Sequence, residues 1–270
     1  MQSILFRAGV SGTDALLADL WEHATTGVLE EAGGLRAFFD DDADLSALLE
    51  AYAAEIEERR HEAPVDLQQF ERDGWEGILV GKRFFVSPPW IAGPLPPDRI
   101  HLAIDTSLAF GTGRHESTQL ALEALETYLM PGATVVDVGC GSGILSLAAA
   151  LLGAGRVISC DLDPHAVAST RARLPSPVFQ GSADALRSAS ADLVLANITP
   201  RILDALAYDL NRITKPDGLL VLAGFLRDNP PRHWKPQQTR ERGDWILWTC
   251  RPDTFQTAPD TPYRPDPNWW

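Results

Sequence analysis

A glycine-rich turn after a valine-rich strand is the part of the sequence with the clearest chemistry. Residues Val135–Val138 are typical of a buried strand, and Gly139, Gly141 and Gly143 follow it at alternate positions. Glycines there let the backbone approach a ligand closely, and the next helix presents free N–H groups to the same space. The spacing differs from the G-x-G-x-x-G pattern of dinucleotide sites, because Ile144 stands where the third glycine belongs. We expect the three glycines to bind a nucleotide-like cofactor other than NAD.

Two acidic residues indicate which cofactor this is. Asp137, near the end of the first strand, suits a cationic ligand better than a pyrophosphate, and S-adenosylmethionine carries a sulfonium and an ammonium but no phosphate. Asp161 ends a second predicted strand, Arg156–Asp161, about 20 residues after the glycines, where ribose hydroxyls are held. The alternative is that Asp161 is only a loop residue. Asp163 and Pro164 then predict a helix start, as N-cap and first helical residue.

A second informative string, residues 105–118, precedes the glycine turn. Its two glycines on either side of Thr112 indicate a tight backbone path, and a helix is predicted over Gln119–Leu129, with its first turn near the cofactor. Thr118 is equally well interpreted as a hydroxyl ligand or as a helix-start residue bonded only to backbone. His115 could act as an acid or base, although a single loop histidine is more often structural. The six histidines are scattered, and we expect no metal site.

Composition limits the possible functions. The chain has 270 residues and no run of about 18 apolar ones, and it begins without a signal-peptide pattern, so we expect a cytoplasmic protein that does not contact membranes. The net charge of −14 repels nucleic-acid phosphates, and a basic protein is the more suitable substrate. Cys140, Cys160 and Cys250 have neither disulfide nor zinc spacing and are expected to be reduced core residues.

Residues 1–57 are predicted to form a small α+β domain. Hydrophobic periodicity indicates its elements: a strand over Ser3–Val10, a helix over Thr13–His23, a hairpin of Thr26–Glu31 and Leu35–Phe39, and a helix over Asp44–Glu57. Such a domain is a common binding module. Residues 58–99 are charged and then proline-rich, which predicts a linker with short strands at Trp75–Val80 and Lys82–Val86.

Residues 100–253 are predicted to form the larger domain. Strands and helices alternate from Gly132 to Cys250, which is typical of a doubly wound, mostly parallel α/β sheet. The later predicted elements are strands at Leu193–Ala196, Leu219–Ala223 and Trp245–Cys250, a helix at Ile202–Ile213 and a turn at Arg240–Gly243. Residues 254–270 are rich in proline and polar residues, and we expect a disordered or loosely docked tail.

The string Phe110–Thr118, the glycine turn and Leu195–Ile198 together resemble the bacterial methyltransferases that modify the eleventh protein of the large ribosomal subunit, the PrmA family. The string reads F-G-T-G-x-H-x-x-T, which is far more specific than a glycine loop. The resemblance covers residues 75–224 well and is weak after residue 227. It implies a class I S-adenosylmethionine-dependent domain joined to a small N-terminal, ferredoxin-like domain that recognises the protein substrate.

The resemblance also implies roles for individual residues. Cofactor contacts would fall on Thr118, Gly139, Asp161 and Asn197, and Phe110 and Thr112, with the glycines beside them, would line the donor methyl group and the acceptor channel. The product would be a methylated, up to trimethylated, lysine or N-terminal amine. We expect the enzyme to be a monomer.

The expected reaction is an in-line displacement by a neutral amine, in which positioning supplies much of the rate. Lysine has a reference pKa of about 10.4, so the site must desolvate the ammonium or let its proton pass to water. Asn197 and the carbonyl of Ile198 could accept hydrogen bonds from the amine and aim its lone pair. The alternative is that Asn197 is a turn residue at the end of a strand.

Two features depart from related enzymes. The residues after Asn197 are Ile198, Thr199 and Pro200, not the N-P-P-Y pattern of many amine methyltransferases. The prolines within Arg227–Gln238 predict that the usual helix between the fifth and sixth strands is shortened or missing. Two other functions stay open: a methyltransferase for another protein or a small molecule, and a non-catalytic, cofactor-binding ribosome-assembly factor.

Overall fold

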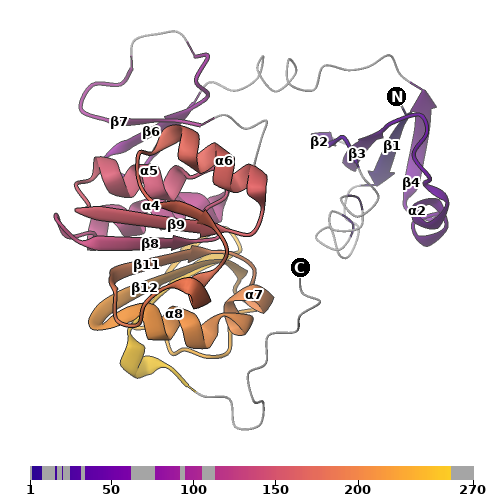
Figure 1. Ribbon diagram of the computed structural model, residues 1–270. Helices are drawn as coiled ribbons and strands as arrows, with labels where there is room; N and C mark the ends of the chain where they lie inside the picture. Colours follow the sequence, from indigo (N-terminus) through magenta and orange to yellow (C-terminus); the bar gives the residue numbers. More distant parts are fainter. Residues whose placement is uncertain are drawn as a thin grey trace. The chain divides into compact units, whose positions relative to one another are not determined.

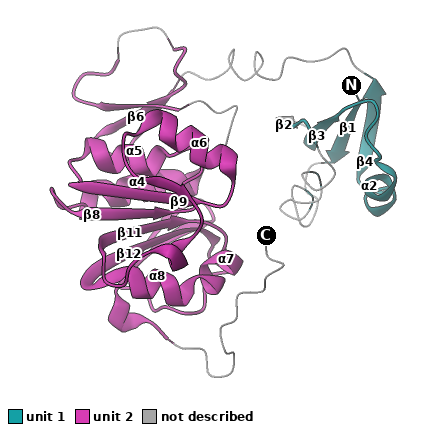
Figure 2. Ribbon diagram, viewed as in Figure 1, with its two compact units in different colours: residues 1–74 teal, residues 75–270 magenta. Residues whose placement is uncertain are grey.

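The structure is a computed structural model that describes residues 2–7, 16, 20, 25–31, 34–61, 77–91, 95–104 and 113–256 (Figure 1). The chain forms two compact units, Met1–Gly74 and Trp75–Trp270 (Figure 2). The division therefore falls inside the linker expected over residues 58–99, and the short strands predicted there belong to the second unit.

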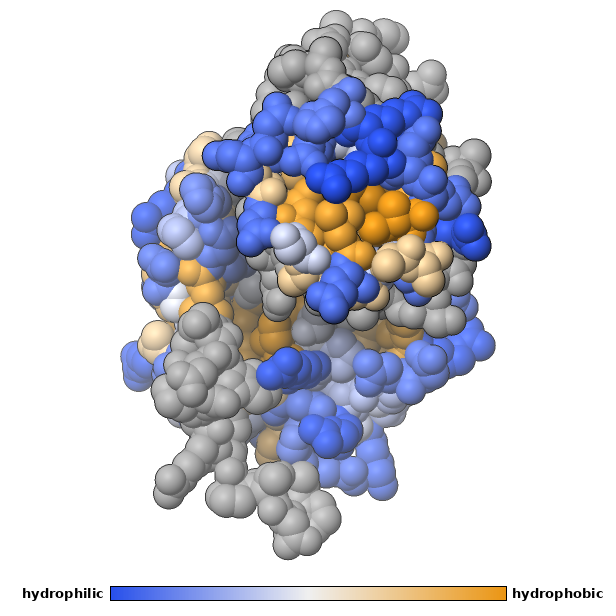
Figure 3. All heavy atoms as spheres, turned by 90° about the vertical axis from the view of Figure 1, so that its right-hand side faces the viewer, coloured by the Kyte–Doolittle hydropathy of each residue, from blue (hydrophilic) through white to orange (hydrophobic). Residues whose placement is uncertain are grey.

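Most apolar side chains of the described residues lie in three buried clusters, one in the first unit and two in the second. On the face that Figure 3 shows, hydrophilic residues dominate, with smaller apolar areas among them. None of the described helices has the length and hydrophobicity needed to cross a membrane.

The first unit contains a four-stranded antiparallel sheet with the order β2-β3-β1-β4. Its elements are β1 (Gln2–Arg7), β2 (Gly27–Glu31), β3 (Gly34–Phe39), α2 (Ser46–Ala51) and β4 (Ile56–His61). Ile4 and Phe6, two positions apart in β1, face the same side of the sheet and share a core with Leu16, Leu20 and Leu48. The predicted hairpin is confirmed, and so is the first strand as far as Arg7, while residues 8–10 lie outside the described residues. The remainder of the predicted helix Thr13–His23 lies outside the described residues, so the ferredoxin-like class stays a prediction.

Two expectations for this unit are wrong. The helix predicted over Asp44–Glu57 ends at Ala51, because Ile56 begins β4, which pairs with β1. Residues 58–61, expected to start a linker, continue this strand. Their charges do not prevent pairing, because β4 is an edge strand and Glu58 is bridged by Arg36 at 3.0 Å and Arg60 at 2.5 Å.

The second unit is built on a seven-stranded sheet with the order β10-β9-β8-β11-β12-β14-β13. The strands are β8 (Thr134–Val138), β9 (Arg156–Asp161), β10 (Val178–Gln180), β11 (Ala191–Asn197), β12 (Thr214–Leu226), β13 (Gln238–Arg242) and β14 (Trp245–Cys250). The first five are parallel, and β14 inserts antiparallel between β12 and β13. This confirms the predicted α/β class with a mostly parallel sheet.

Helices cover both faces of this sheet (Figure 1). They are α4 (Glu116–Tyr128), α5 (Ile144–Leu151) and α6 (Pro164–Arg173) on one side, and α7 (Pro200–Ala205) and α8 (Ala207–Ile213) on the other. Short 3-10 turns occur at Ala183–Ala185 and Pro252–Thr254. Neighbouring residues of one strand are buried on opposite faces of the sheet. Val135 packs in the cluster with α4 and α5, and Val136 packs in the cluster with α7 and α8. This two-sided burial explains why adjacent positions such as Val135 and Val136 are both apolar, which made the strand recognisable.

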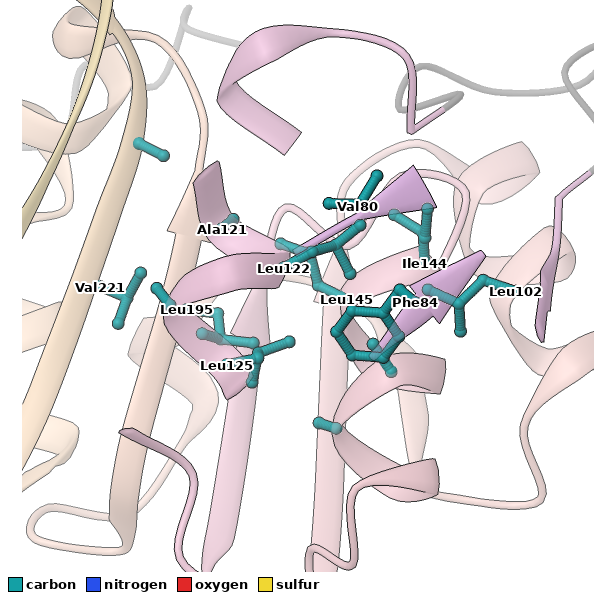
Figure 4. Close-up of a cluster of buried hydrophobic side chains, with 14 of the residues drawn as sticks. Val80, Phe84, Leu102, Ala121, Leu122, Leu125, Ile144, Leu145, Leu195 and Val221 are labelled. Atoms are coloured by element: carbon teal, nitrogen blue, oxygen red, sulfur yellow. The ribbon is translucent and has the colours of Figure 1, made fainter. Parts of the chain in front are cut away.

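A small three-stranded sheet packs against α4 and α5. It consists of β5 (Ile78–Val80), β6 (Phe84–Ser87) and β7 (Ile100–Ala103). Phe84 and Leu102 point from it toward Ile144 and Leu145 at the start of α5 (Figure 4). The strand β7, which was not predicted, ends just before the string that starts at residue 105. The small sheet therefore positions the residues that come just before that string.

The end of the chain differs in part from expectation. The helix predicted over Ile202–Ile213 is broken at Leu206, and the predicted turn at Arg240 is strand β13. Arg240 and Arg242 of this edge strand contact α4, through Thr127 at 2.9 Å and Glu123 at 2.6 Å. Residues 227–237, all described, contain no helix, as the prolines predicted.

Candidate functional site

A cavity of about 390 Å³ lies at the carboxyl ends of β8, β9 and β11. The strand order reverses between β8 and β11, and open α/β sheets bind ligands at such a point. The cavity is lined mainly by His115, Ser117 and Thr118 of the α4 start, the turn Gly139–Ser142, Asp161 and Leu162, Gly181 and Ser182, Asn197 to Thr199, Ile202, Leu206, Gly224 and Trp245. Among these described lining residues there is no lysine or arginine. The carboxylate of Asp161 gives this lining a negative charge, which favours hydroxyl or cationic groups of a ligand over a phosphate.

Gly139 and Gly143 of the glycine turn have little room for a side chain, because other parts of the protein lie close to them. Gly139 has φ 74°, and a Cβ on it would lie 2.4 Å from Cγ2 of Ile198. Gly141 also lines the cavity, and its N–H points to Asp161. Gly143 has a different structural role. A Cβ on this residue would lie 2.7 Å from Oγ1 of Thr170 on α6. Gly139 and Gly141 thus shape the cavity wall, whereas Gly143 lets α5 pack against α6.

Asp161 joins the glycine turn to the start of α6. One carboxylate oxygen accepts the N–H of Gly141 at 2.9 Å, and the other accepts the N–H of Asp163 at 3.0 Å. Asp163 in turn caps α6 by accepting the N–H of His165 at 2.8 Å, as predicted. Asp161 is therefore held rigidly while still lining the cavity. Its remaining lone pairs are available to donors on a ligand.

Asn197 and Thr118 meet on the opposite wall. The Asn197 amide donates to Oγ1 of Thr118 at 3.2 Å, across 79 positions of sequence. The buried Oδ1 of Asn197 has no hydrogen-bond partner in the described part of the chain. A buried acceptor without a partner is costly, and in a ligand cavity it indicates a donor on the ligand. Thr118 is thus more than a helix-start residue, because its hydroxyl orients this amide.

His115 makes structural contacts, whereas the sequence alone did not decide between a structural and an acid–base role. Its ring caps α4, with Nδ1 lying 3.3 Å from the N–H of Ser117 and 2.8 Å from its hydroxyl. The ring also packs edge-on against Trp245, with centroids 4.3 Å apart. Sequence reasoning missed Trp245 as a lining residue, since no local signal brings the start of β14 to a turn 130 positions earlier.

Asp137 is not among the residues that line the cavity, contrary to the expectation that it contacts the ligand directly. It lies buried beneath the turn, where it accepts the hydroxyl of Ser146 at 2.5 Å, and Ser146 lies 2.7 Å from the hydroxyl of Ser159. Burial raises the pKa of Asp137 to about 6. The direction of a side chain on a strand could not be read from its position alone. Asp137 links β8, α5 and β9 beneath the site.

Phe110 and Thr112 lie outside the described residues, so their roles stay predictions. Residues 113–118 of the string are described, and Gly113 has φ 81° and closely approaches both the small sheet and α5. A Cβ on Gly113 would lie 2.6 Å from Cγ1 of Val86 and 2.8 Å from Cδ1 of Ile144. These close approaches explain why position 113, three residues before α4 begins at Glu116, has to be a glycine.

The three cysteines are free and buried, as predicted, and we expect them to resist alkylation. Burial raises the pKa of Cys160 and of Cys250 to about 12 and raises that of Cys140 further. Because the thiolate is the reactive form, iodoacetamide at pH 8 should modify the native protein at least about 100-fold more slowly than the denatured protein. Mass spectrometry of both samples measures this, and rapid native labelling of any of the three would contradict it.

Comparisons with known proteins agree over both units. A family model described as "Ribosomal protein L11 methyltransferase (PrmA)" matches residues 3–251. A ribosomal protein L11 methyltransferase of Pseudomonas paraeruginosa is 38% identical over 234 residues, 78% of each chain. Another, from Dechloromonas aromatica, is 37% identical over 244 residues, 84% of this chain and 79% of the other. The crystal structure of ribosomal protein L11 methylase from Lactobacillus delbrueckii subsp. bulgaricus is 27% identical with a TM-score of 0.57, covering 64% of this chain and 96% of that one.

Proposed function

The chain belongs to the ribosomal protein L11 methyltransferase family, a family of S-adenosylmethionine-dependent enzymes, and on that premise we propose that it methylates lysine or N-terminal amino groups of this large-subunit ribosomal protein. The observation that carries the proposal is the buried Oδ1 of Asn197, which has no hydrogen-bond partner in the described part of the chain and belongs to a residue that lines the cavity. This acceptor suits the N–H of an amine held beside the cofactor.

The cofactor half of the cavity is formed by the glycine turn and Asp161. S-adenosylmethionine supplies a methyl group activated by a sulfonium. Gly139 and Gly141 line the space that the adenosyl group would occupy, and Asp161 accepts the ribose hydroxyls with the lone pairs not used by Gly141 and Asp163. The lack of lysine and arginine among the described lining residues fits a cofactor without phosphates. Asp137 supports this half from beneath.

The acceptor half is formed by Asn197 and the residues that follow it. Oδ1 of Asn197 accepts a hydrogen bond from the amine, and Thr118 keeps the amide from rotating. The apolar side chains of Ile198, Ile202 and Leu206 line this wall, and this apolar surface disfavours the ammonium form and promotes loss of its proton. Phe110 and Thr112 complete this half in the proposal.

The first unit recognises the substrate in this proposal, and the acidic chain, with net charge −14, attracts a basic protein. We also propose that the enzyme acts in the cytoplasm, as a monomer and without binding nucleic acid directly.

Incubation of the purified ribosomal protein L11 with the enzyme and S-adenosylmethionine tests the proposal. Mass spectrometry should find whole methyl groups on lysine side chains or on the N-terminus, and none when the cofactor is omitted. If L11 stays unmodified while another protein of a cell lysate becomes methylated, the substrate is wrong. If the cofactor binds and nothing is methylated, the chain is not a catalyst.

A further inference from the structure

The proline-rich segment between β12 and β13 makes a specific contact with α7. Arg232 lies in this segment, and its backbone N–H donates to Oδ1 of Asp204 at 2.7 Å while its Nε donates to Oδ2 at 2.8 Å. Both oxygens of a single carboxylate on α7 are therefore engaged by a single residue of the segment. The Asp204 side chain is 12% exposed and that of Arg232 is 80% exposed.

Helix α7 depends on such contacts for its position. It has six residues, and its N-cap Thr199 makes no side-chain cap hydrogen bond. A helix this short is not stable by itself, so tertiary contacts have to hold it. Leu203 is the residue that α7 buries in the core, while Ile202 on α7 and Leu206 after it line the cavity. A shift of α7 would therefore move the cavity wall beside Asn197.

The segment that holds Asp204 is itself anchored two residues further along the chain. Trp234 is 3% exposed and belongs to the core under α7 and α8. Its ring packs against Phe255 with centroids 5.8 Å apart, and the two residues form an isolated β-bridge. The N–H of Gln256 also donates to the carbonyl of His233 at 2.7 Å. The start of the predicted tail is thus docked on the segment and keeps Arg232 in place.

We propose that Asp204 and Arg232 are positioning residues that hold α7 so that Ile202 and Leu206 form the acceptor wall of the cavity. This inference rests on the proposed function, because it takes the wall after Asn197 as the acceptor side. An exposed ion pair alone contributes little. Here, however, the partly buried carboxylate also binds a backbone N–H, which a substitution of Arg232 leaves in place.

Three alanine variants test the inference in steady-state methylation of L11. Asp204→Ala loses both hydrogen bonds and should raise the KM for L11 about tenfold, with the cofactor affinity within about twofold of the wild type. Arg232→Ala keeps the backbone bond and should raise the KM about threefold. Arg227→Ala is the matched control, since Arg227 pairs with Glu241 at 2.7 Å in the same region without contacting α7, and its KM should not change.

Hydrogen–deuterium exchange of residues 200–206 gives a readout that needs no substrate. Asp204→Ala should speed exchange in these residues, while urea unfolding and exchange in β8 remain as in the wild type. A wild-type KM together with wild-type exchange in Asp204→Ala would overturn the inference. If the wild type itself fails to methylate L11, the proposed function fails, and the exchange data still decide whether Asp204 holds α7.

Discussion

We expect Asp161→Ala to lower the affinity for S-adenosylmethionine by about 100-fold, because a carboxylate that accepts two ribose hydroxyls contributes two charge-assisted hydrogen bonds. Both oxygens of Asp161 are already positioned by backbone N–H groups, so little conformational entropy is lost when the ligand binds. Isothermal titration calorimetry with the cofactor measures the change.

The same carboxylate supports the glycine turn, and the experiment has to separate the two effects. Asp161→Asn keeps one acceptor oxygen for a backbone N–H or a hydroxyl, and its loss of affinity should be smaller than that of Asp161→Ala. Asp163→Ala is the matched control: it removes the cap of α6, at a cost of about 1 kcal/mol in stability, but it removes no group that lines the cavity. An unchanged affinity in Asp161→Ala would reject the ribose role.

The elements around the cofactor half could be predicted from the sequence because local signals coincide there. The strand before Gly139 is rich in valine, β9 has the predicted bounds, and Asp163 caps α6 as its position before Pro164 suggested. In each case the residues that specify the element are close together in the chain. A segment can be predicted from its sequence when the hydrophobic pattern, the turn residues and the helix cap all indicate the same structure.

The elements that were missed depend on contacts between distant residues. β4 and β13 are edge strands with charged side chains, and only pairing with a neighbour identifies them. Two further features likewise depend on how strands and helices pack: the burial of the Asp137 side chain against Ser146, and the contact between the rings of Trp245 and His115. Periodicity cannot report such contacts, because tertiary pairing overrides local preference.

The last prediction concerns Asn197, whose replacement should separate catalysis from stability. Asn197→Ala should lower kcat by about 100-fold, since the amine loses the acceptor that orients it and a small misplacement costs that much. The free protein should keep its stability to within about 1 kcal/mol, because the lost bond to Thr118 is offset by removal of an unsatisfied buried oxygen. Single-turnover kinetics with L11 and urea unfolding without cofactor measure the two quantities.

Variants of Thr118 show whether the orientation of the amide matters. Thr118→Ser keeps the hydroxyl that accepts from Asn197 and should retain most of the turnover, whereas Thr118→Val removes it and should lower kcat by less than Asn197→Ala does. A graded series of this kind is expected only if the unpartnered Oδ1 meets the amine. If Asn197→Ala instead lost stability and turnover in proportion, the role of Asn197 would be structural. A buried acceptor that has no partner until the substrate binds destabilises the free protein, so its removal should not lower the stability.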